Sequence, residues 1–229
     1  MRITVDTKII VLTNQKGGCG KTTVTMQLAG ALGRDGKKVL IVDADPQGAA
    51  LRWASYADDQ KPFPAALSGL SVVGPKVHQE VRKYLGQYDY IFIDCPPAVD
   101  SPIPKSALMV ANVALVPVIP SPTDLWAAKS IQKLIEDMKD VYNTGLKAYI
   151  VPNMIAITNV QKAIIGPIKE LGMEITNTVL GNRTAYRESA IVGGTVFDLK
   201  TESAITAQKE ITRLKNELIK IFKAQPATK

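Results

Sequence analysis

Short apolar runs, separated by helical patterns, constrain the fold of this chain more than any other feature. The strongest runs cover residues 9–13, 38–43, 90–94, 113–118 and 148–153. They are rich in Ile and Val and lack polar alternation, as expected for strands buried on both faces. Weaker strand signals occur near 70–73 and 175–180. Helical patterns cover 21–34, 47–59, 76–86, 103–109, 123–142, 160–171, 184–191 and 202–223. This alternation predicts an α/β fold with a mostly parallel twisted sheet and helices on both faces.

The composition limits the class of protein further. The length of 229 residues and the apolar fraction of 46% favour one folded domain over residues 1–229. The net charge of +7 favours an acidic partner such as nucleic acid. No apolar run approaches the roughly 18 residues that cross a bilayer, and the N-terminal segment lacks a signal-peptide pattern, so we expect a cytoplasmic protein. With two cysteines and one histidine, His78, a disulfide framework or a histidine-based metal site is not expected.

A glycine-rich segment links the first predicted strand to the first predicted helix. It reads Lys16-Gly17-Gly18-Cys19-Gly20-Lys21-Thr22-Thr23. Glycines let the backbone approach a phosphate group, and the amides at a helix N-terminus add partial positive charge. We therefore expect this whole segment to bind the phosphates of a nucleotide. Lys21 would reach the β- and γ-phosphates, and the Thr22 hydroxyl would ligate Mg²⁺.

The spacing departs from the usual phosphate loop, which has a glycine six positions before the lysine, where this chain has Gln15. The sequence KGG-x-GKTT instead carries a second lysine, Lys16, and resembles the deviant Walker A motif of the ParA/MinD family. The resemblance extends from Lys8 to about Phe222 and implies a P-loop NTPase that uses ATP and Mg²⁺. It also implies a homodimer in the ATP state, in which Lys16 reaches the phosphates of the nucleotide in the other protomer.

Acidic residues stand at the ends of two further predicted strands. Asp43 and Asp45 lie in a segment, Asp-Ala-Asp-Pro-Gln, that matches the family, and Asp94 ends the run 90–94 as in a Walker B strand. The carboxyl ends of parallel strands meet at the edge where open α/β sheets bind ligands. We expect Asp94 to hold Mg²⁺ through a water, Asp43 to face the magnesium shell and Asp45 to orient the attacking water. An aspartate at a strand end is also a common helix cap, so a structural role stays open for each.

The sequence says less about the nucleotide base. Asn153 ends the run 148–153, where the family usually offers an amide or carboxylate to adenine, and Phe197 lies in a glycine-rich loop, 193–198. We name Asn153 and Phe197 as candidate base contacts, although asparagine also favours turns. The preference for ATP over GTP rests on the resemblance alone.

The predicted helix 202–223 has apolar residues on one side and most of its basic residues elsewhere. Residues 200–229 hold seven basic and three acidic side chains, more than half of the net charge of +7. Three interpretations stay open: a solvated helix packed on the core, a surface that binds DNA phosphates without reading sequence, and a membrane anchor of the MinD kind. The polar, proline-containing end of the chain disfavours the anchor. The candidate DNA contacts are Lys209, Arg213, Lys215, Lys220, Arg183 and Arg187.

The resemblance points to the small ParA subgroup, exemplified by ParF-type partitioning proteins. It implies an ATPase that is weak alone, binds DNA non-specifically on the nucleoid, and is switched by a ParB-like or centromere-binding partner that stimulates hydrolysis. Plasmid or chromosome segregation is the leading prediction. The alternatives are a membrane-cycling ATPase of the MinD kind and the positioning of a protein cargo such as carboxysomes or chemoreceptor arrays.

Overall fold

The computed structural model describes residues 6–97, 100–119, 121–155 and 172–224 and, for 122–127, the backbone only. Within these residues, seven strands form one sheet in the order β3-β2-β4-β1-β5-β6-β7, and every pairing is parallel. The strands are β1 (Lys8–Leu12), β2 (Val39–Asp43), β3 (Ala66–Gly69), β4 (Tyr90–Asp94), β5 (Val113–Val118), β6 (Lys147–Pro152) and β7 (Glu174–Ile175). The predicted α/β class with a mostly parallel sheet is confirmed.

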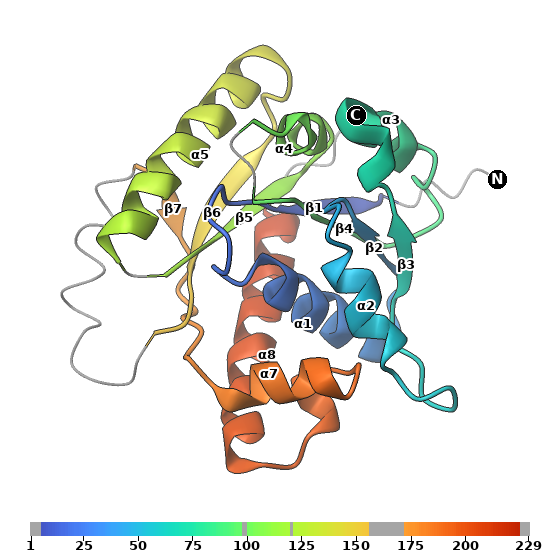
Figure 1. Cartoon of the computed structure of the whole chain (residues 1–229). Helices are drawn as coiled ribbons and strands as arrows, with labels where there is room; N and C mark the ends of the chain where they lie inside the picture. The colour runs from blue at the N-terminus through green and yellow to red at the C-terminus, as the bar shows by residue number, and fades with distance from the viewer. Residues whose placement is uncertain (1–5, 98–99, 120, 156–171, 225–229) are drawn as a thin grey trace.

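Helices pack against both faces of the sheet (Figure 1). One face carries α1 (Lys21–Arg34), α2 (Ala49–Ser55), α7 (Thr184–Ile191) and α8 (Glu202–Lys223). The other face carries α3 (Val77–Arg82), α4 (Pro102–Leu108) and α5 (Pro122–Val141). Two short 3-10 helices, η1 (Ser71–Lys76) and η2 (Val196–Asp198), lie in the connections.

Alternate strand residues supply the two halves of the core. In β4, Phe92 packs with the cluster under α1 and α8, whereas Ile91 and Ile93 pack with the cluster under α3, α4 and α5. All three side chains are fully buried. Successive side chains of a strand point to opposite faces, so a strand covered on both sides must be apolar throughout, which explains the continuous apolar runs.

One predicted strand is displaced. The edge strand β3 lies at 66–69, the Leu70 amide still donates to the Asp43 carbonyl at 2.9 Å, and Ser71–Lys76 forms η1. Val72 and Val73 are β-branched, but Gly74 follows with φ of 51° and Pro75 has no amide hydrogen, so the chain turns here. Val72 is 92% exposed, so its side chain lies at the surface although valine is typical of strands.

Another predicted strand, 175–180, shortens to the two residues of β7. Beyond it, the amides of Asn177 and Thr178 donate to the Glu217 carboxylate at 2.6 Å and 3.1 Å rather than to a neighbouring strand. The predicted helix 160–171 lies outside the described residues.

The topology places a binding edge at the end of β1. Strands β4, β2 and β3 lie on one side of β1, and β5, β6 and β7 lie on the other. Open α/β sheets bind ligands at such a switch point, beyond the carboxyl ends of the strands. The glycine-rich loop follows β1 at this edge. In the part of the chain that the structure describes, no helix is both long and apolar enough to span a bilayer.

Candidate functional site

The loop between β1 and α1 has the backbone of an anion-binding site. Gly18 and Gly20 have φ of 74° and 94°, the left-handed region that glycine adopts without strain. A Cβ on Gly20 would lie 2.2 Å from Nδ2 of Asn153, so this position also needs glycine for space. α1 begins at Lys21 with no side-chain cap and no acidic residue in its first turn. Its N-terminal amides and its dipole therefore favour a bound anion.

The Lys21 ammonium lies inside this loop. The side chain is 6% exposed. Its Nζ donates to the Lys16 carbonyl at 3.0 Å and lies 3.9 Å from Sγ of Cys19, which is itself buried. The backbone of the loop thus folds around a positive charge. This is the arrangement expected of a phosphate-binding lysine.

Asn14 ties the loop to the sheet. It is 1% exposed; its Nδ2 donates to the Pro117 carbonyl at 2.8 Å, and its Oδ1 accepts the Lys16 amide at 3.1 Å. Sequence reasoning missed Asn14, although its place at the end of a buried strand, just before the loop, was a usable signal. The backbone of Lys16 is therefore fixed at both its amide and its carbonyl. The reach of Lys16 into a second protomer concerns a pair of chains and stays a prediction.

Thr22 and Asp94 meet where β1 and β4 end. Asp94 pairs with Leu12, the last residue of β1, and the Thr22 hydroxyl donates to its Oδ2 at 2.6 Å. The buried Oδ1 has no hydrogen-bond partner among the described residues. Burial raises the pKa of Asp94 to about 7, against the lowering effect of the Thr22 hydrogen bond. A buried carboxylate beside a hydroxyl, with one oxygen open, fits a hard cation such as Mg²⁺, which prefers oxygen ligands.

Asp43 lies beside Asp94 in the sheet register but makes other contacts. Its side chain is buried, and its two oxygens accept the amides of Asp45 at 3.2 Å and Leu51 at 3.0 Å. Burial raises the pKa of Asp43, while these amide hydrogen bonds lower it. Asp43 therefore caps the first turn of α2, the structural alternative noted above. Its place in the magnesium shell stays a prediction.

Asp45 lies in the turn between β2 and α2. It is partly buried, and its Oδ1 accepts the Gln47 amide at 2.9 Å. This bond fixes the carboxylate beside the end of β2, two residues beyond Asp43. The role of Asp45 toward the attacking water stays a prediction.

Asn153 lies at the loop, as predicted, but with a different contact. Its Nδ2 donates to the Cys19 carbonyl at 2.8 Å, and the side chain is 4% exposed. In this structure its Nδ2 therefore contacts the loop backbone, and the contact with adenine stays a prediction.

The structure does not bring Phe197 to the loop. Phe197 lies in η2 beside Arg34, the last residue of α1, with the guanidinium carbon 6.0 Å from the ring centroid. Gln27, in the middle of α1, also contacts this segment, because its Oε1 accepts the Val196 amide at 2.9 Å. α1 has 14 residues and spans about 20 Å, so Phe197 lies toward the end of α1 that is remote from the loop.

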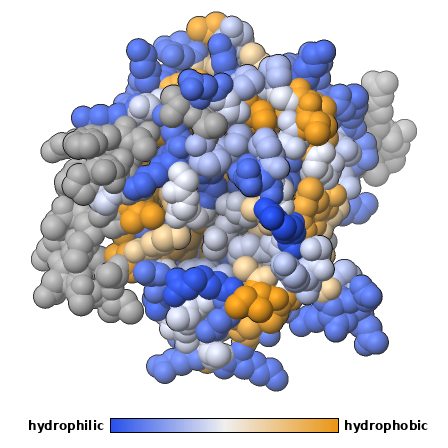
Figure 2. All heavy atoms as spheres, viewed as in Figure 1, coloured by the Kyte–Doolittle hydropathy of each residue, from blue (hydrophilic) through white to orange (hydrophobic). Residues whose placement is uncertain are grey.

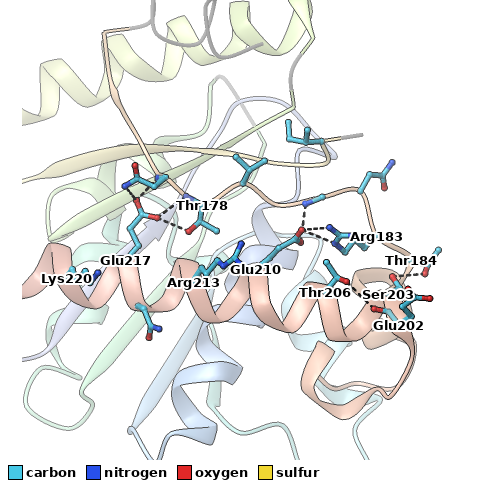
Figure 3. A pocket seen from close by; sticks show the side chains of 16 residues that line it. Thr178, Arg183, Thr184, Glu202, Ser203, Thr206, Glu210, Arg213, Glu217 and Lys220 are labelled. Atoms are coloured by element: carbon cyan, nitrogen blue, oxygen red, sulfur yellow. Dashed lines mark hydrogen bonds and ion pairs between the residues drawn. The ribbon is translucent and has the colours of Figure 1, made fainter. Parts of the chain in front are cut away.

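A second polar region is the groove between α8 and the segment that joins β7 to α7 (Figure 3). Two glutamates of α8, two turns apart, point toward that segment. Glu210 accepts hydrogen bonds from the amide of Gly181, two guanidinium nitrogens of Arg183 and the hydroxyl of Tyr186. Glu217 accepts hydrogen bonds from both amide groups of Asn177 and from the amide and hydroxyl of Thr178. Sequence reasoning treated both glutamates only as charges, and their spacing of seven residues was the signal that they share a helix face.

Four of the six candidate DNA contacts are exposed. Lys209, Arg213 and Lys220 lie within about 40° of one another around the axis of α8, and Arg187 is exposed on α7. We call Lys209, Arg213 and Lys220 the basic ridge. From first to last it spans about 16 Å along the helix.

The other two candidates are already paired within the chain. Arg183 bonds Glu210 at 2.6 Å, and Lys215 bonds Asp35. Their side chains are only 16% and 11% exposed. Burial against acidic partners therefore removes Arg183 and Lys215 from the predicted DNA surface.

Comparison with known proteins agrees with this geometry. The family model described as the CobQ/CobB/MinD/ParA nucleotide binding domain matches residues 10–196. The chain is 31% identical over 211 residues to maintenance of carboxysome distribution protein A of Halothiobacillus neapolitanus, with 92% of this chain and 95% of that protein covered. It is 29% identical over 204 residues to sporulation initiation inhibitor protein Soj of Bacillus subtilis, with 71% of this chain and 79% of that protein covered.

Solved structures share the fold. A Cyanothece McdA variant in complex with ATP superposes with a TM-score of 0.76 at 18% identity, covering 93% of this chain and 96% of that one. The septum site-determining protein MinD of Pyrococcus horikoshii, complexed with Mg-ADP, superposes with a TM-score of 0.71 at 24% identity, covering 97% and 100%. From the family model and the sequence relatives together, the chain belongs to the CobQ/CobB/MinD/ParA nucleotide-binding family, as a member of its ParA/MinD group of ATPases.

Proposed function

We propose that this chain is a magnesium-dependent ATPase that positions a cellular cargo by cycling between an ATP-bound dimer on DNA and a released state. The observation that carries the proposal is the loop 16–23, in which an uncapped helix N-terminus, the buried Lys21 and the Thr22–Asp94 pair lie together at the end of β1. A second lysine, Lys16, stands at the start of that loop.

Each residue of the site would have its own role at the terminal phosphates. The α1 amides and Lys21 would bind the β- and γ-phosphates, and Asp45 would hold a water in line with the γ-phosphate. Thr22 and Asp94 would hold Mg²⁺, which when bound offsets the negative charge that the phosphates gather during hydrolysis.

Exposed apolar residues at the end of α7 support contact with a protein partner. Ile191 and Val192, at the end of α7, are 75% and 47% exposed. In the view of Figure 2 an apolar patch lies over the end of α7, with strongly hydrophilic surface on either side of it. A second protomer that brings its own Lys16 to the phosphates would cover part of this face, so dimerisation would depend on the nucleotide.

The basic ridge supports non-specific binding to DNA on the nucleoid. Glu210 and Glu217 are bonded to Arg183, Thr178 and their neighbours, whereas Lys209, Arg213 and Lys220 are exposed, the last two at the rim of the same groove. Exposed cations at this spacing suit phosphates, and such contacts carry no sequence information.

The cargo has two candidates. The relative at 31% identity is named for carboxysome distribution, which favours a protein cargo and a partner protein that stimulates hydrolysis. Soj and the chromosome partitioning protein ParA of Caulobacter vibrioides, at 29% and 27% identity, favour DNA segregation with a ParB-like partner.

The proposal is tested by calorimetry and light scattering with ATP or ADP, each with and without magnesium. ATP with magnesium should bind and shift the protein from monomer to dimer, and ADP should bind without the shift. Lys16→Ala should bind ATP and stay monomeric, whereas Lys37→Ala, in an exposed turn, should behave as wild type. No binding of ATP with magnesium would refute the function, and a dimer in the Lys16→Ala protein would refute the cross-protomer role.

A further inference from the structure

Asn153 is a second asparagine, after Asn14, that bonds the phosphate loop. Its Nδ2 donates to the Cys19 carbonyl at 2.8 Å, in the middle of the loop. The side chain is 4% exposed, and its nitrogen occupies the space into which a Cβ on Gly20 would project, at 2.2 Å. The amide is therefore packed against the loop, and its position leaves Gly20 no room for any side chain.

The strand end that carries Asn153 is itself fixed on both sides. The Asn153 amide donates to the Val118 carbonyl at 2.9 Å, on β5. On the other side, the Leu180 amide donates to Pro152 and the Ile155 amide donates to Leu180, at 2.9 Å and 3.0 Å. A donor on such an anchored backbone can impose its position on the loop rather than follow it.

Met154 adds a local constraint. Its φ of 54° is the one positive value at a non-glycine residue among the described residues. A left-handed conformation is uncommon for methionine and persists only where the surroundings determine it. Its side chain also faces the loop, since Cε lies 3.6 Å from the Cβ position of Gly20. The chain thus makes a strained corner directly at the loop.

We infer that Asn153 is a positioning residue for the phosphate loop. The inference rests on the proposed function, because it concerns how the same site binds phosphates. Asn153 keeps the Cys19–Gly20 peptide in its phosphate-ready conformation before the ligand arrives. Without the bond, the Cys19 carbonyl loses its donor, the loop samples other conformations, and the ligand must order it on binding.

A positioning role and a base-reading role of Asn153 predict different affinities for ATP, GTP and inorganic triphosphate. A positioning residue affects every ligand that carries the terminal phosphates, so Asn153→Ala should weaken ATP, GTP and inorganic triphosphate, each with magnesium, by a similar factor of about 10, the size of one lost buried hydrogen bond. The ratio of ATP to GTP affinity should not change. A base-reading residue would change that ratio and leave inorganic triphosphate unaffected.

Hydrogen exchange of the protein without ligand gives a second readout. The amides of residues 14–20 should exchange faster in Asn153→Ala and also in Asn153→Asp, which keeps the size of the side chain but removes the donor. The matched control is Asn143→Ala, because Asn143 Nδ2 likewise donates to backbone carbonyls, those of Leu108 and Ala111 at 2.8 Å, away from the loop. The control should leave loop exchange and all three affinities unchanged.

The outcomes separate cleanly. A changed ATP to GTP ratio with unchanged triphosphate binding would overturn the inference in favour of base reading, and unchanged affinities with unchanged loop exchange would overturn it in favour of a passive packing role. If wild-type protein bound none of the three ligands, the proposed function itself would fail, and this is known before any variant is compared.

Discussion

The phosphate loop and the basic ridge both gather positive charge, but they do so by different means. At the loop, the charge is carried by backbone amides and by Lys21, and buried side chains such as Asn14 and Asn153 hold it in place. On α8, the charge is carried by exposed side chains, and the acidic residues between them are turned aside into a groove. Substitutions in the phosphate loop disturb the backbone that binds the ligand, so we expect large effects there. On the basic ridge each substitution removes one side-chain contact, so we expect DNA affinity to fall in small steps.

The largest effect should come from adding a single methyl group to the loop. Gly20→Ala combines a φ of 94°, which costs an alanine about 1–2 kcal/mol, with a clash at 2.2 Å from Asn153. We expect ATP affinity to fall by roughly 100-fold or more, since each 1.4 kcal/mol is a factor of about 10. Calorimetry with ATP and magnesium measures it.

The control for that substitution is Gly36→Ala. Gly36 also has a positive φ, 77°, but no atom lies within 4 Å of its Cβ position. This variant should lose a little stability and keep its ATP affinity. Equal losses of affinity in both proteins would contradict the argument that the loop is special.

On the α8 side, the largest effect should be on stability rather than on binding. Glu210→Ala removes the partner of Arg183 and of Tyr186 in a buried network, and breaking such a pair costs about 3 kcal/mol or more. Urea denaturation should show the loss. Glu80→Ala breaks an exposed pair with Lys83 and should cost less than about 1 kcal/mol. An effect of Glu80→Ala as large as that of Glu210→Ala would remove the distinction between buried and exposed pairs.

Single cations of the ridge should have smaller, additive effects on DNA binding. For the ATP-loaded protein, Arg213→Ala and Lys220→Ala should each weaken binding several-fold and lower the slope of log affinity against log salt by about 0.9, the value for one phosphate contact. Lys215→Ala should leave the slope unchanged, because Lys215 is paired with Asp35. Electrophoretic mobility shifts over a salt series measure the slopes. A lower slope in Lys215→Ala would show that Lys215 does contact DNA.

The smallest effect should be a pH dependence of stability that leaves the loop unaffected. Burial alone would raise the pKa of Asp198, but hydrogen bonds from Lys61, Thr195 and Arg34 hold this pKa well below its ordinary value. A lowered pKa stabilises the fold above the unfolded value of about 4, and this stability is lost as pH falls further. The stability difference between wild type and Asp198→Asn should therefore be constant from pH 7 to pH 5 and shrink below about pH 4. A difference independent of pH down to pH 2 would contradict the pairing.

The sequence predicted the elements and motifs whose form is set locally. The apolar runs match β1, β2, β4, β5 and β6 to within a residue, because strands covered on both faces must be apolar throughout. The loop 16–23 was recognised because glycines, a lysine and a helix start must follow one another in the chain. Asp94 was placed because parallel strands end at a common edge.

What the sequence could not predict depends on partners that are distant in the chain. Arg183 and Lys215 looked like DNA contacts until the fold placed Glu210 and Asp35 beside them. Phe197 is a candidate base contact from sequence alone, but the fold places it beside Arg34, the last residue of α1. Val72 and Val73 have the composition of a strand, yet Gly74 and Pro75 turn the chain away from the sheet.

The hydrogen bond from Lys21 to the Lys16 carbonyl has a consequence for what the loop accepts. This contact uses one of the three N–H donors of the ammonium and fixes its position, so the other donors are aimed before a ligand arrives. An oxygen with a full negative charge makes a stronger hydrogen bond with these donors than a neutral oxygen does. The loop therefore favours charged groups over the neutral hydroxyls of a nucleoside or a sugar.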